Sequence, residues 1–333
     1  MTMTHISNPP TMQLKVKAME RLHPMIASVV LVSPDGGALP AFEPGSHVRV
    51  QVTLADGSQD WRHYSLVNLE PNADALSHPA AYRLGVRLED GGRGGSRFMH
   101  ALRAGDTVIV QAPRNEFPAG PTIGPALLLA GGIGVTPITA LAAECRRTGR
   151  PVRMVYASRS RSQLAFVDGL RDLLGDSLSL HVDDEAGRSL DAASLLASCA
   201  RDETVYVCGP QPMLDAVFAA ADQLGWTRDR VRFELFSAPQ PQDGDRAFEV
   251  VLQQSGRTLH VGSEESILQC MEAAGCDPLA DCRRGECGVC AVDVLEGEID
   301  HRDHVLTPAE KAAGKVIQIC VSRAKGPRLV LDY

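Results

Sequence analysis

Four cysteines near the C-terminus have a spacing that is typical of a metal-cluster site. Cys282, Cys287 and Cys290 follow the pattern C-x4-C-x2-C, and Cys320 comes after 29 intervening residues. A plant-type [2Fe–2S] centre uses this ligand spacing. Three thiolates of one tight loop can wrap one side of a small cluster, while a fourth from a distant strand closes it.

Two glycines, Gly285 and Gly288, are interleaved with these cysteines. They have no Cβ, so the loop can turn inward and point its N–H groups at anionic sulfurs. A zinc site usually shows two C-x2–4-C or Cys/His pairs, whereas this chain has one C-x2-C pair. A chance grouping of buried free cysteines is the alternative. The pattern predicts that the four cysteines are metal ligands and that the chain carries electrons.

The composition is that of an ordinary globular protein. The 333 residues include 44% hydrophobic and 22% charged residues, and this length indicates two or three domains. A net charge of −8 argues against nucleic acid and an anionic membrane as partners.

The chain shows no membrane or export signal. Its start lacks the basic and apolar parts of a signal peptide, and its longest apolar run, Ala126 to Val135, is too short for a bilayer. Nine cysteines without a leader favour a reducing compartment. We therefore expect a cytoplasmic protein without a membrane partner.

The pattern of apolar residues changes twice along the chain. Residues 1–118 contain short β-rich runs between turn residues, which predicts a small antiparallel β-barrel. Residues 119–236 alternate apolar runs with helical stretches, which predicts an α/β domain with a parallel sheet. Residues 237–247 are rich in Pro, Gln and Asp and predict a linker, followed by a smaller α+β domain at 248–333.

The predicted elements are short and bounded by turns. The expected strands are Ala27–Val32, His47–Val52, Tyr82–Leu88, Thr107–Gln111, Leu127–Ala130, Val152–Ala157, Leu178–His181 and Thr204–Cys208. The expected helices are Ile138–Thr148, Gln163–Leu174 and Pro212–Leu224, and a C-terminal hairpin of Phe248–Gln253 and Thr258–Val261 precedes a helix at Ser266–Ala274.

The barrel segment contains two features that suit a flavin mononucleotide. Arg62-His-Tyr-Ser65 offers a cation, an aromatic face and a hydroxyl at a strand end. Gly91-Gly-Arg-Gly-Gly-Ser96 offers exposed amides for a phosphate, with added charge from Arg93 and Arg97. A strand-end salt bridge and a flexible hairpin loop are the simpler interpretations.

Two glycine turns follow expected strands of the α/β domain. Gly131-Gly-Ile-Gly134 joins a strand to a helix that carries Pro137 near its first turn, where proline is tolerated. A pyrophosphate can approach the helix N-terminus there, although the pattern is not G-x-G-x-x-G. Cys208-Gly-Pro210 ends another strand at the same expected sheet edge, where such sheets bind ligands. A ligand-free turn and a buried structural cysteine are the alternatives.

Taken in order, these motifs resemble the phthalate dioxygenase reductase family, which is of ferredoxin–NADP reductase type. The resemblance covers about Gln13 to Tyr333 and rests on four features: Arg62-His-Tyr-Ser65, Gly131-Gly-Ile-Gly-Val-Thr-Pro137, Cys208-Gly-Pro210 and the cysteine frame. It implies an FMN-binding barrel, an NADH-binding domain and a C-terminal β-grasp ferredoxin domain. It also implies an electron-accepting partner, the oxygenase component of a Rieske system that acts on aromatic or small organic acids.

The resemblance also implies which residues bind the cofactors. For the flavin these are Arg62, Tyr64, Ser65, Gly85, Val86, Arg87, Gly94, Gly95 and Ser96. For the nucleotide they are Gly131, Gly132, Gly134, Ser158, Arg159, Gly209 and Pro210. FMN rather than FAD follows from the C-terminal place of the cluster domain.

The dinucleotide preference rests on a short basic segment. Arg159 and Arg161 follow the second expected strand of the α/β domain and could pair with the 2′-phosphate of NADPH. Family members commonly carry an arginine near the first position and still use NADH. We therefore expect NADH, with NADPH possible; a plain surface loop is the alternative.

The expected enzyme is an NADH-dependent oxidoreductase. A flavin turns a two-electron hydride into single transfers that a [2Fe–2S] cluster accepts. Hydride transfer depends on stacking and distance, so the expected catalytic residues, Thr136, Cys208 and Phe236, arrange nicotinamide against flavin. Glu234 is a weaker candidate.

The acceptor is expected to meet the cluster domain. Its loop residues Arg283, Arg284 and Glu286 are candidates for contact with the acceptor. Residues 248–333 hold 14 Asp and Glu against 9 Lys and Arg, which favours a basic docking patch on the partner, or is only a solvated acidic face. A cytochrome P450 or a free flavin acceptor is the rival reading, and a redox sensor is another. We expect a monomer.

Overall fold

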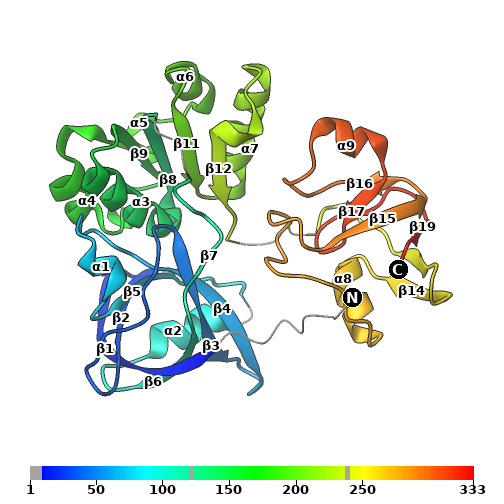
Figure 1. Cartoon of the computed structure of the whole chain (residues 1–333), viewed down its shortest axis with the longest axis horizontal. Coiled ribbons are helices and arrows are strands. Elements are labelled where there is room, and N and C mark those ends of the chain that lie inside the picture. Colours follow the sequence, from blue (N-terminus) through cyan, green and yellow to red (C-terminus); the bar gives the residue numbers. More distant parts are fainter. Residues whose placement is uncertain (1–9, 93, 121–123, 237–240) are drawn as a thin grey trace. The chain divides into compact units, whose positions relative to one another are not determined.

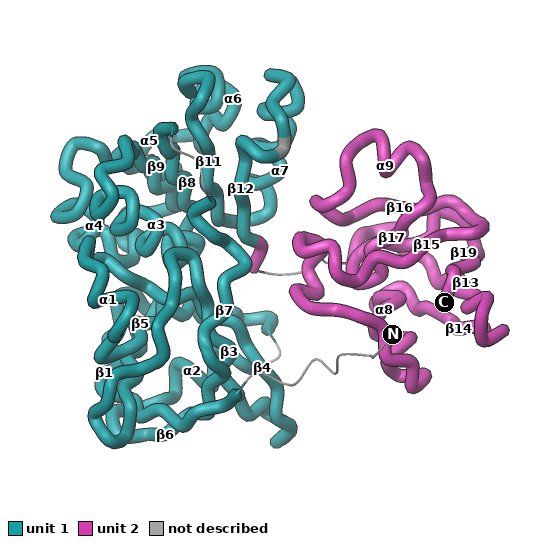
Figure 2. The backbone as a smooth tube through the Cα atoms, viewed as in Figure 1, with its two compact units in different colours: residues 1–234 teal, residues 235–333 magenta. Residues whose placement is uncertain are grey.

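A computed structural model describes residues 10–92, 94–120, 124–236 and 241–333. The chain divides into two compact units, Met1–Glu234 and Leu235–Tyr333 (Figure 2). The expected bounds at 118/119 and 236/237 stay predictions, and residues 237–240 of the expected linker lie outside the described part. Among the described residues, no helix has both the length and the apolar character needed to cross a membrane.

The first unit begins with an antiparallel sheet. Its strands are β1 (Thr11–His23), β2 (Ile26–Val32), β3 (Ser46–Thr53), β4 (Gln59–Ser65), β5 (Tyr82–Arg87), β6 (Thr107–Gln111) and β7 (Arg114–Asn115). They follow the order β4-β3-β6-β1-β2-β5, with β7 beside β3. A bridge from Leu66 to Leu84 joins the segment after β4 to β5, which curls the sheet toward a barrel.

Alternation along the strands builds the core of this barrel. On β3, Val48, Val50 and Val52 are fully buried, while Arg49 and Gln51 between them are partly exposed. Side chains of a strand alternate between faces, so one face of β3 lines the interior. Two short helices, α1 (Asp74–Ser77) and α2 (Gly95–Ala101), flank the sheet. The predicted antiparallel barrel is confirmed.

A five-stranded parallel sheet forms the rest of the first unit. Its strands are β8 (Ala126–Gly131), β9 (Val152–Ser158), β10 (Leu178–Val182), β11 (Thr204–Cys208) and β12 (Val231–Glu234). The order β10-β9-β8-β11-β12 places β8 at the centre. Every residue of β8 is buried, as expected for a parallel strand that helices cover on both faces (Figure 1).

Helices connect the parallel strands, as predicted. They are α3 (Val135–Thr148), α4 (Val167–Leu174), α5 (Asp183–Ala186), α6 (Ala192–Ala197) and α7 (Gln211–Gln223), with 3-10 turns η1 (Gly132–Gly134), η2 (Arg161–Gln163), η3 (Gly175–Ser177) and η4 (Arg228–Arg230). Pro137 occupies the first turn of α3, where sequence analysis expected it. The carboxyl ends of β8 and β11, which are neighbours in the sheet, therefore meet at one edge.

The second unit is a mixed sheet with two helices. Its strands are β13 (Phe248–Leu252), β14 (Arg257–Val261), β15 (Ala291–Glu296), β16 (Ile299–Asp300), β17 (Val316–Gln318), β18 (Arg323–Ala324) and β19 (Arg328–Leu331), and its helices are α8 (Ile267–Ala273) and α9 (Pro308–Ala313). The main sheet has the order β14-β13-β19-β15-β17. A capping box of Ser266 and Gln269 begins α8. The predicted hairpin, helix and β-grasp class are confirmed.

Candidate functional site

The fold of the second unit brings the four cysteines of the expected cluster together. Cys282, Cys287 and Cys290 lie on the loop between α8 and β15, and Cys320 follows β17. The two strands pair antiparallel, with Ala291 opposite Gln318. Because Cys290 directly precedes β15 and Cys320 lies two residues after the end of β17, this register brings the two cysteines close together.

The four sulfurs are arranged as two pairs. A hydrogen bond from Cys287 lowers the pKa of the Cys282 thiol, and one from Cys320 lowers the pKa of the Cys290 thiol. Among the described residues, no three Cys, His, Asp or Glu side chains gather as they would around a single metal ion. Four thiols are the donor set that a plant-type [2Fe–2S] cluster uses.

Backbone amides of the loop converge on these sulfurs. The amide of Arg284 donates to Cys282 Sγ over 3.4 Å. Hydrogen bonds from the amides of Glu286 and Cys287 further lower the pKa of Cys282. Gly285 has a positive φ of 79°, and a Cβ there would lie 2.7 Å from a Val321 methyl carbon. The loop therefore needs glycine at this position and presents amides to anionic sulfurs, which fits a [2Fe–2S] cluster.

Two charged side chains of the cluster loop are buried. Arg284 and Glu286 are, with Arg283, the loop residues expected to contact an acceptor. Their side chains are only 8% and 9% exposed and form an ion pair with each other. The expectation was wrong for these two residues, because the loop folds them inward. Arg283 is exposed and pairs with Glu272 on α8.

The two glycine turns of the parallel sheet pack directly against each other. A Cβ on Gly134 would lie 2.2 Å from the Cys208 carbonyl oxygen, and one on Gly131 would lie 2.6 Å from Pro210 Cδ. A Cβ on Gly209 would lie 3.1 Å from Gly131 Cα. The residues of these two turns, including Gly132, were expected to bind the nucleotide. The structure brings them together at the carboxyl ends of β8 and β11. The Cys208 side chain is fully buried beneath them.

The segment with Arg159 and Arg161 follows β9, the neighbour of β8, at the same edge of the sheet. Ser158 ends β9 and is buried, and Arg159 after it is exposed. The carbonyl oxygen of Arg159 accepts a hydrogen bond from the Asp184 amide at 3.0 Å. Arg161 forms a bidentate pair with Glu185, with nitrogen–oxygen distances of 2.7 and 2.6 Å. One of the two arginines considered for a 2′-phosphate is therefore already paired with a carboxylate.

The residues expected to face the flavin ring lie on β4 and β5. Arg62 donates to the Asp60 carboxylate and the Trp61 carbonyl, so the strand-end salt bridge foreseen as the simpler interpretation is present. Burial raises the pKa of Tyr64. Ser65 is buried at the end of β4.

Gly85 of β5 connects the barrel to the nucleotide sheet. A Cβ on Gly85 would lie 2.6 Å from Thr136 Cγ2, so the barrel strand and the first turn of α3 are in direct contact. His100 bonds to the carbonyl of Val86 over 3.0 Å, and Arg87 is exposed at the strand end. Thr136 donates to the Ile133 carbonyl over 3.0 Å, which orients its methyl group.

The expected phosphate loop lies beside a hollow of the barrel. A Cβ on Gly94 would lie 3.6 Å from the Ala55 amide, and one on Gly95 would lie 2.8 Å from Arg62 Nε. Ser96 Oγ accepts a hydrogen bond from the Glu89 amide at 3.0 Å. Arg93 lies outside the described residues.

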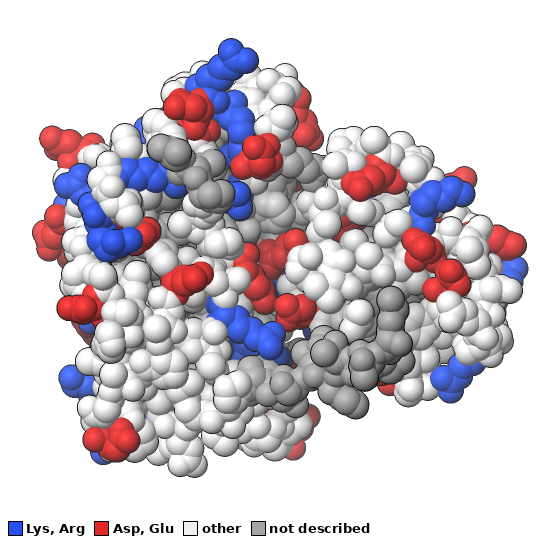
Figure 3. All heavy atoms as spheres, viewed as in Figure 1, with Lys and Arg blue, Asp and Glu red and all other residues white. Residues whose placement is uncertain are grey.

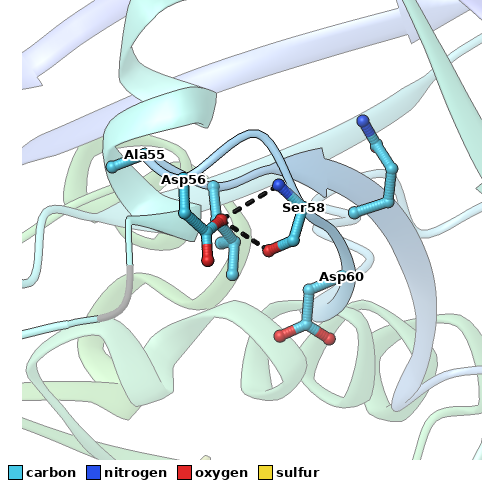
Figure 4. Close-up of a pocket in the computed structure, with 6 residues that line it drawn as sticks. Ala55, Asp56, Ser58 and Asp60 are labelled. Carbon is cyan, nitrogen blue, oxygen red and sulfur yellow. Dashed lines mark hydrogen bonds between the residues drawn. The ribbon is translucent and has the colours of Figure 1, made fainter.

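The hollow itself is lined by the turn between β3 and β4 and by the start of β4, through Leu54, Ala55, Asp56, Ser58, Gln59 and Asp60 (Figure 4). The Asp56 carboxylate accepts hydrogen bonds from the amide and hydroxyl of Ser58, at 2.9 and 2.6 Å. Asp60 contributes a second carboxylate to the lining. The lining thus contains two carboxylates, one of them paired with Arg62, so it lacks the excess positive charge that favours a phosphate.

Phe236 and Glu234 lie at the junction between the units. Phe236 belongs to the second unit and is 42% exposed, while Glu234 ends β12 and is buried. The role of Phe236 beside a flavin stays a prediction.

Comparisons with known proteins agree with this arrangement. A family model described as the 2Fe-2S iron-sulfur cluster binding domain matches residues 250–325. A toluene-4-sulfonate monooxygenase system reductase subunit of Comamonas testosteroni is 40% identical over 92% of this chain and 94% of its own. The solved structure of phthalate dioxygenase reductase is 34% identical with a TM-score of 0.69, covering 97% of this chain and 98% of that one.

The chain belongs to the phthalate dioxygenase reductase family. It is an oxidoreductase of the kind that serves as reductase subunit in oxygenase systems, and its C-terminal unit is a [2Fe–2S] domain. A carnitine monooxygenase reductase subunit of Escherichia coli (strain K12) is 38% identical over 96% of this chain and 98% of its own. An intact type IV self-sufficient cytochrome P450 monooxygenase is 35% identical with a TM-score of 0.71 over 97% of this chain. This chain spans only 41% of that P450 chain.

Sequence reasoning missed one residue in the reductase's first unit. Phe166 has a left-handed φ of 58°, which is unusual for a bulky residue. A Cβ on Gly85 would lie 2.9 Å from its ring carbon Cε2. The ring therefore covers Gly85 next to Thr136. No motif marks it, because a backbone conformation is not visible in residue type.

Proposed function

We propose that electrons pass from NADH through FMN and the [2Fe–2S] cluster to a Rieske-type oxygenase component that acts on an aromatic or small organic acid. The observation that carries this proposal is the pairing of the four cysteines under converging amides, in a chain that also contains a flavin-reductase type barrel and a parallel nucleotide sheet. When bound, a flavin accepts two electrons together and passes them on singly, which matches a one-electron cluster.

The chain's own residues position the reactants in this proposal. The glycine turns at Gly131–Gly134 and Cys208–Pro210 admit the dinucleotide, and the Thr136 methyl lies against Gly85 of the proposed flavin strand. Arg62, Tyr64 and Ser65 of β4 hold the flavin, with Gly94, Gly95 and Ser96 on its phosphate side. We propose FMN because the cluster domain is C-terminal. We also propose that the protein is cytoplasmic and monomeric.

The acceptor is proposed to be a separate oxygenase component. Relatives named as reductase subunits of toluene-4-sulfonate and carnitine monooxygenase systems support this. Figure 3 shows acidic and basic side chains spread over both units of the visible face. The net charge of −5 in residues 248–333 is consistent with a basic docking patch on the partner.

A Cys320→Ser variant tests the order of transfer. We expect the variant to keep NADH-dependent reduction of ferricyanide, which a reduced flavin can reduce directly, and to lose at least tenfold of its reduction of a Rieske oxygenase component. Cys276→Ser, which changes a cysteine outside the four, is the matched control and should keep both activities. Equal oxygenase reduction by the Cys320→Ser variant and the unchanged chain would overturn the proposed path.

A cytochrome P450 acceptor is the second candidate, favoured by the P450 monooxygenase whose structure contains a similar segment. Stopped-flow mixing of the NADH-reduced chain with a P450 and with a Rieske oxygenase separates the two. Faster transfer to the P450 would favour this alternative.

A further inference from the structure

The cluster loop contains two buried charges. Arg284 Nη2 lies 2.6 Å from Glu286 Oε1, and the two side chains are 8% and 9% exposed. The other carboxylate oxygen, Glu286 Oε2, accepts the amide hydrogen of Leu235 at 2.8 Å. Arg284 stands two residues after Cys282, and Glu286 directly precedes Cys287. Both charges are thus part of the segment between two proposed cluster ligands.

Stability alone does not account for this pair. Removing two charges from water costs about as much as their attraction returns, so an apolar pair of similar volume is often equally stable. The pair can instead affect electron transfer. A fixed charge beside a redox centre changes the free energy of adding an electron to that centre. The potential of an iron–sulfur cluster depends on nearby charge, hydrogen bonds to its sulfurs and solvent exposure.

We propose that Arg284 and Glu286 are positioning residues that set the reduction potential of the cluster held by the four cysteines. This inference rests on the cluster of the proposed function. The guanidinium stabilises the additional negative charge of the reduced cluster, and the Arg284 amide on Cys282 Sγ acts in the same direction. The carboxylate opposes reduction, and it also ties the loop to the Leu235 backbone. The balance of the two charges sets the potential.

The same loop provides a matched pair in solvent. Arg283 and Glu272 form an ion pair whose side chains are 55% and 35% exposed. Water and salt screen exposed charges far more than buried ones. Neutralising Glu272 should therefore change the potential much less than neutralising Glu286, although both carboxylates pair with neighbouring arginines.

A potentiometric titration of the full chain, followed by electron paramagnetic resonance, tests the proposal. Glu286→Gln keeps the shape of the side chain and removes its charge. We expect it to shift the equilibrium toward the reduced cluster at least tenfold, which is about 59 mV upward for one electron. Arg284→Met should shift it toward the oxidised cluster by a similar factor. Glu272→Gln should shift it less than threefold.

The direction in which the reduction potential shifts in each variant separates an electrostatic role from a structural one. A loosened loop would move both variants in the same direction or lower only the iron content per chain. Unchanged potentials in both variants, or shifts of the same sign, would overturn the proposal. If Arg284→Met does not fold, Arg284→Lys keeps the charge and should stay within threefold of the unchanged chain, and a larger shift would overturn the charge argument. Absence of any reducible cluster in the unchanged chain would instead overturn the proposed function.

Discussion

At the proposed nucleotide edge, a carboxylate already pairs with one of the two arginines that could bind a 2′-phosphate. Arg161 is paired bidentately with Glu185, and Asp183 and Asp184 precede that glutamate on α5. Three carboxylates beside the segment after β9 outnumber its two arginines. A dianionic 2′-phosphate is repelled there, whereas the hydroxyl of NADH can donate to a carboxylate. Local charge therefore supports NADH over NADPH.

We predict that Glu185→Gln improves the use of NADPH. The change removes one repelling charge and loosens the hold on Arg161. A fully exposed charge contributes little, so the ratio of kcat/KM for NADPH to that for NADH should rise only by a small factor, up to about fivefold. Asp168→Asn on α4, which also neutralises an exposed partner of an arginine, should leave the ratio unchanged. A ratio equal in all three proteins would show that Glu185 does not contribute to the choice.

At the scale of elements, the proposed nucleotide site depends on how closely two turns approach each other. The end of β8 lies against the end of β11, and Gly134 has no room for a side chain beside the Cys208 carbonyl. The parallel order of the sheet creates this approach, because it makes the two strands neighbours.

Gly134→Ala is therefore expected to separate the two turns. Overpacking of this kind costs about 1–3 kcal/mol of unfolding free energy, and NADH affinity should fall at least tenfold. Gly326→Ala, at a glycine with no neighbouring atom within 4 Å and outside the proposed binding sites, is the control. Urea unfolding and an NADH binding titration measure both effects. Wild-type affinity in the Gly134→Ala variant would contradict the proposed nucleotide edge.

Ion pairs attach the segment before β13 to the rest of the second unit. Arg302 pairs with Asp245 and Asp300, and its Nη1 lies 2.9 Å from Asp245 Oδ2. Arg323 approaches the same carboxylate. The hydrogen bond from Arg302 lowers the pKa of Asp245 from 3.8 to about 2. The expected linker at 237–247 thus ends in residues that are fastened to the sheet.

The sign of this pKa shift gives a pH prediction. A depressed folded pKa means that the stabilisation is complete above about pH 4 and is lost as the pH falls toward 2. Asp245→Asn should therefore lower the unfolding free energy equally at pH 7.5 and pH 5.5. Asp243→Asn, two residues earlier and exposed, should have little effect at either pH. A loss that fades between pH 7.5 and 5.5 would contradict the assignment to Asp245.

The sequence predicted strands and helices better than it predicted side-chain placement. Hydrophobic runs located most strands of the parallel sheet to within a residue or two, because buried strands leave a continuous apolar signal. The long strand β1 was not named, since few of its side chains are buried. The inward turn of Arg284 and the left-handed Phe166 were not predictable, because each depends on contacts with distant segments.

At the scale of the whole molecule, one chain combines a β-barrel, a parallel α/β sheet and a cluster domain. A barrel and a parallel sheet share the first unit and meet at Gly85 and Thr136. The cluster domain forms the second unit (Figure 2). Placing flavin and cluster on one polypeptide raises the effective concentration of each for the other, so transfer between them does not depend on diffusion of two proteins.

An anaerobic titration of the purified chain with NADH, followed by visible absorption and electron paramagnetic resonance, tests the proposed electron path. We expect that flavin absorption bleaches and that the signal of a reduced [2Fe–2S] cluster appears in the same titration. Bleaching of the flavin without a cluster signal would contradict that path and leave only a flavin reductase.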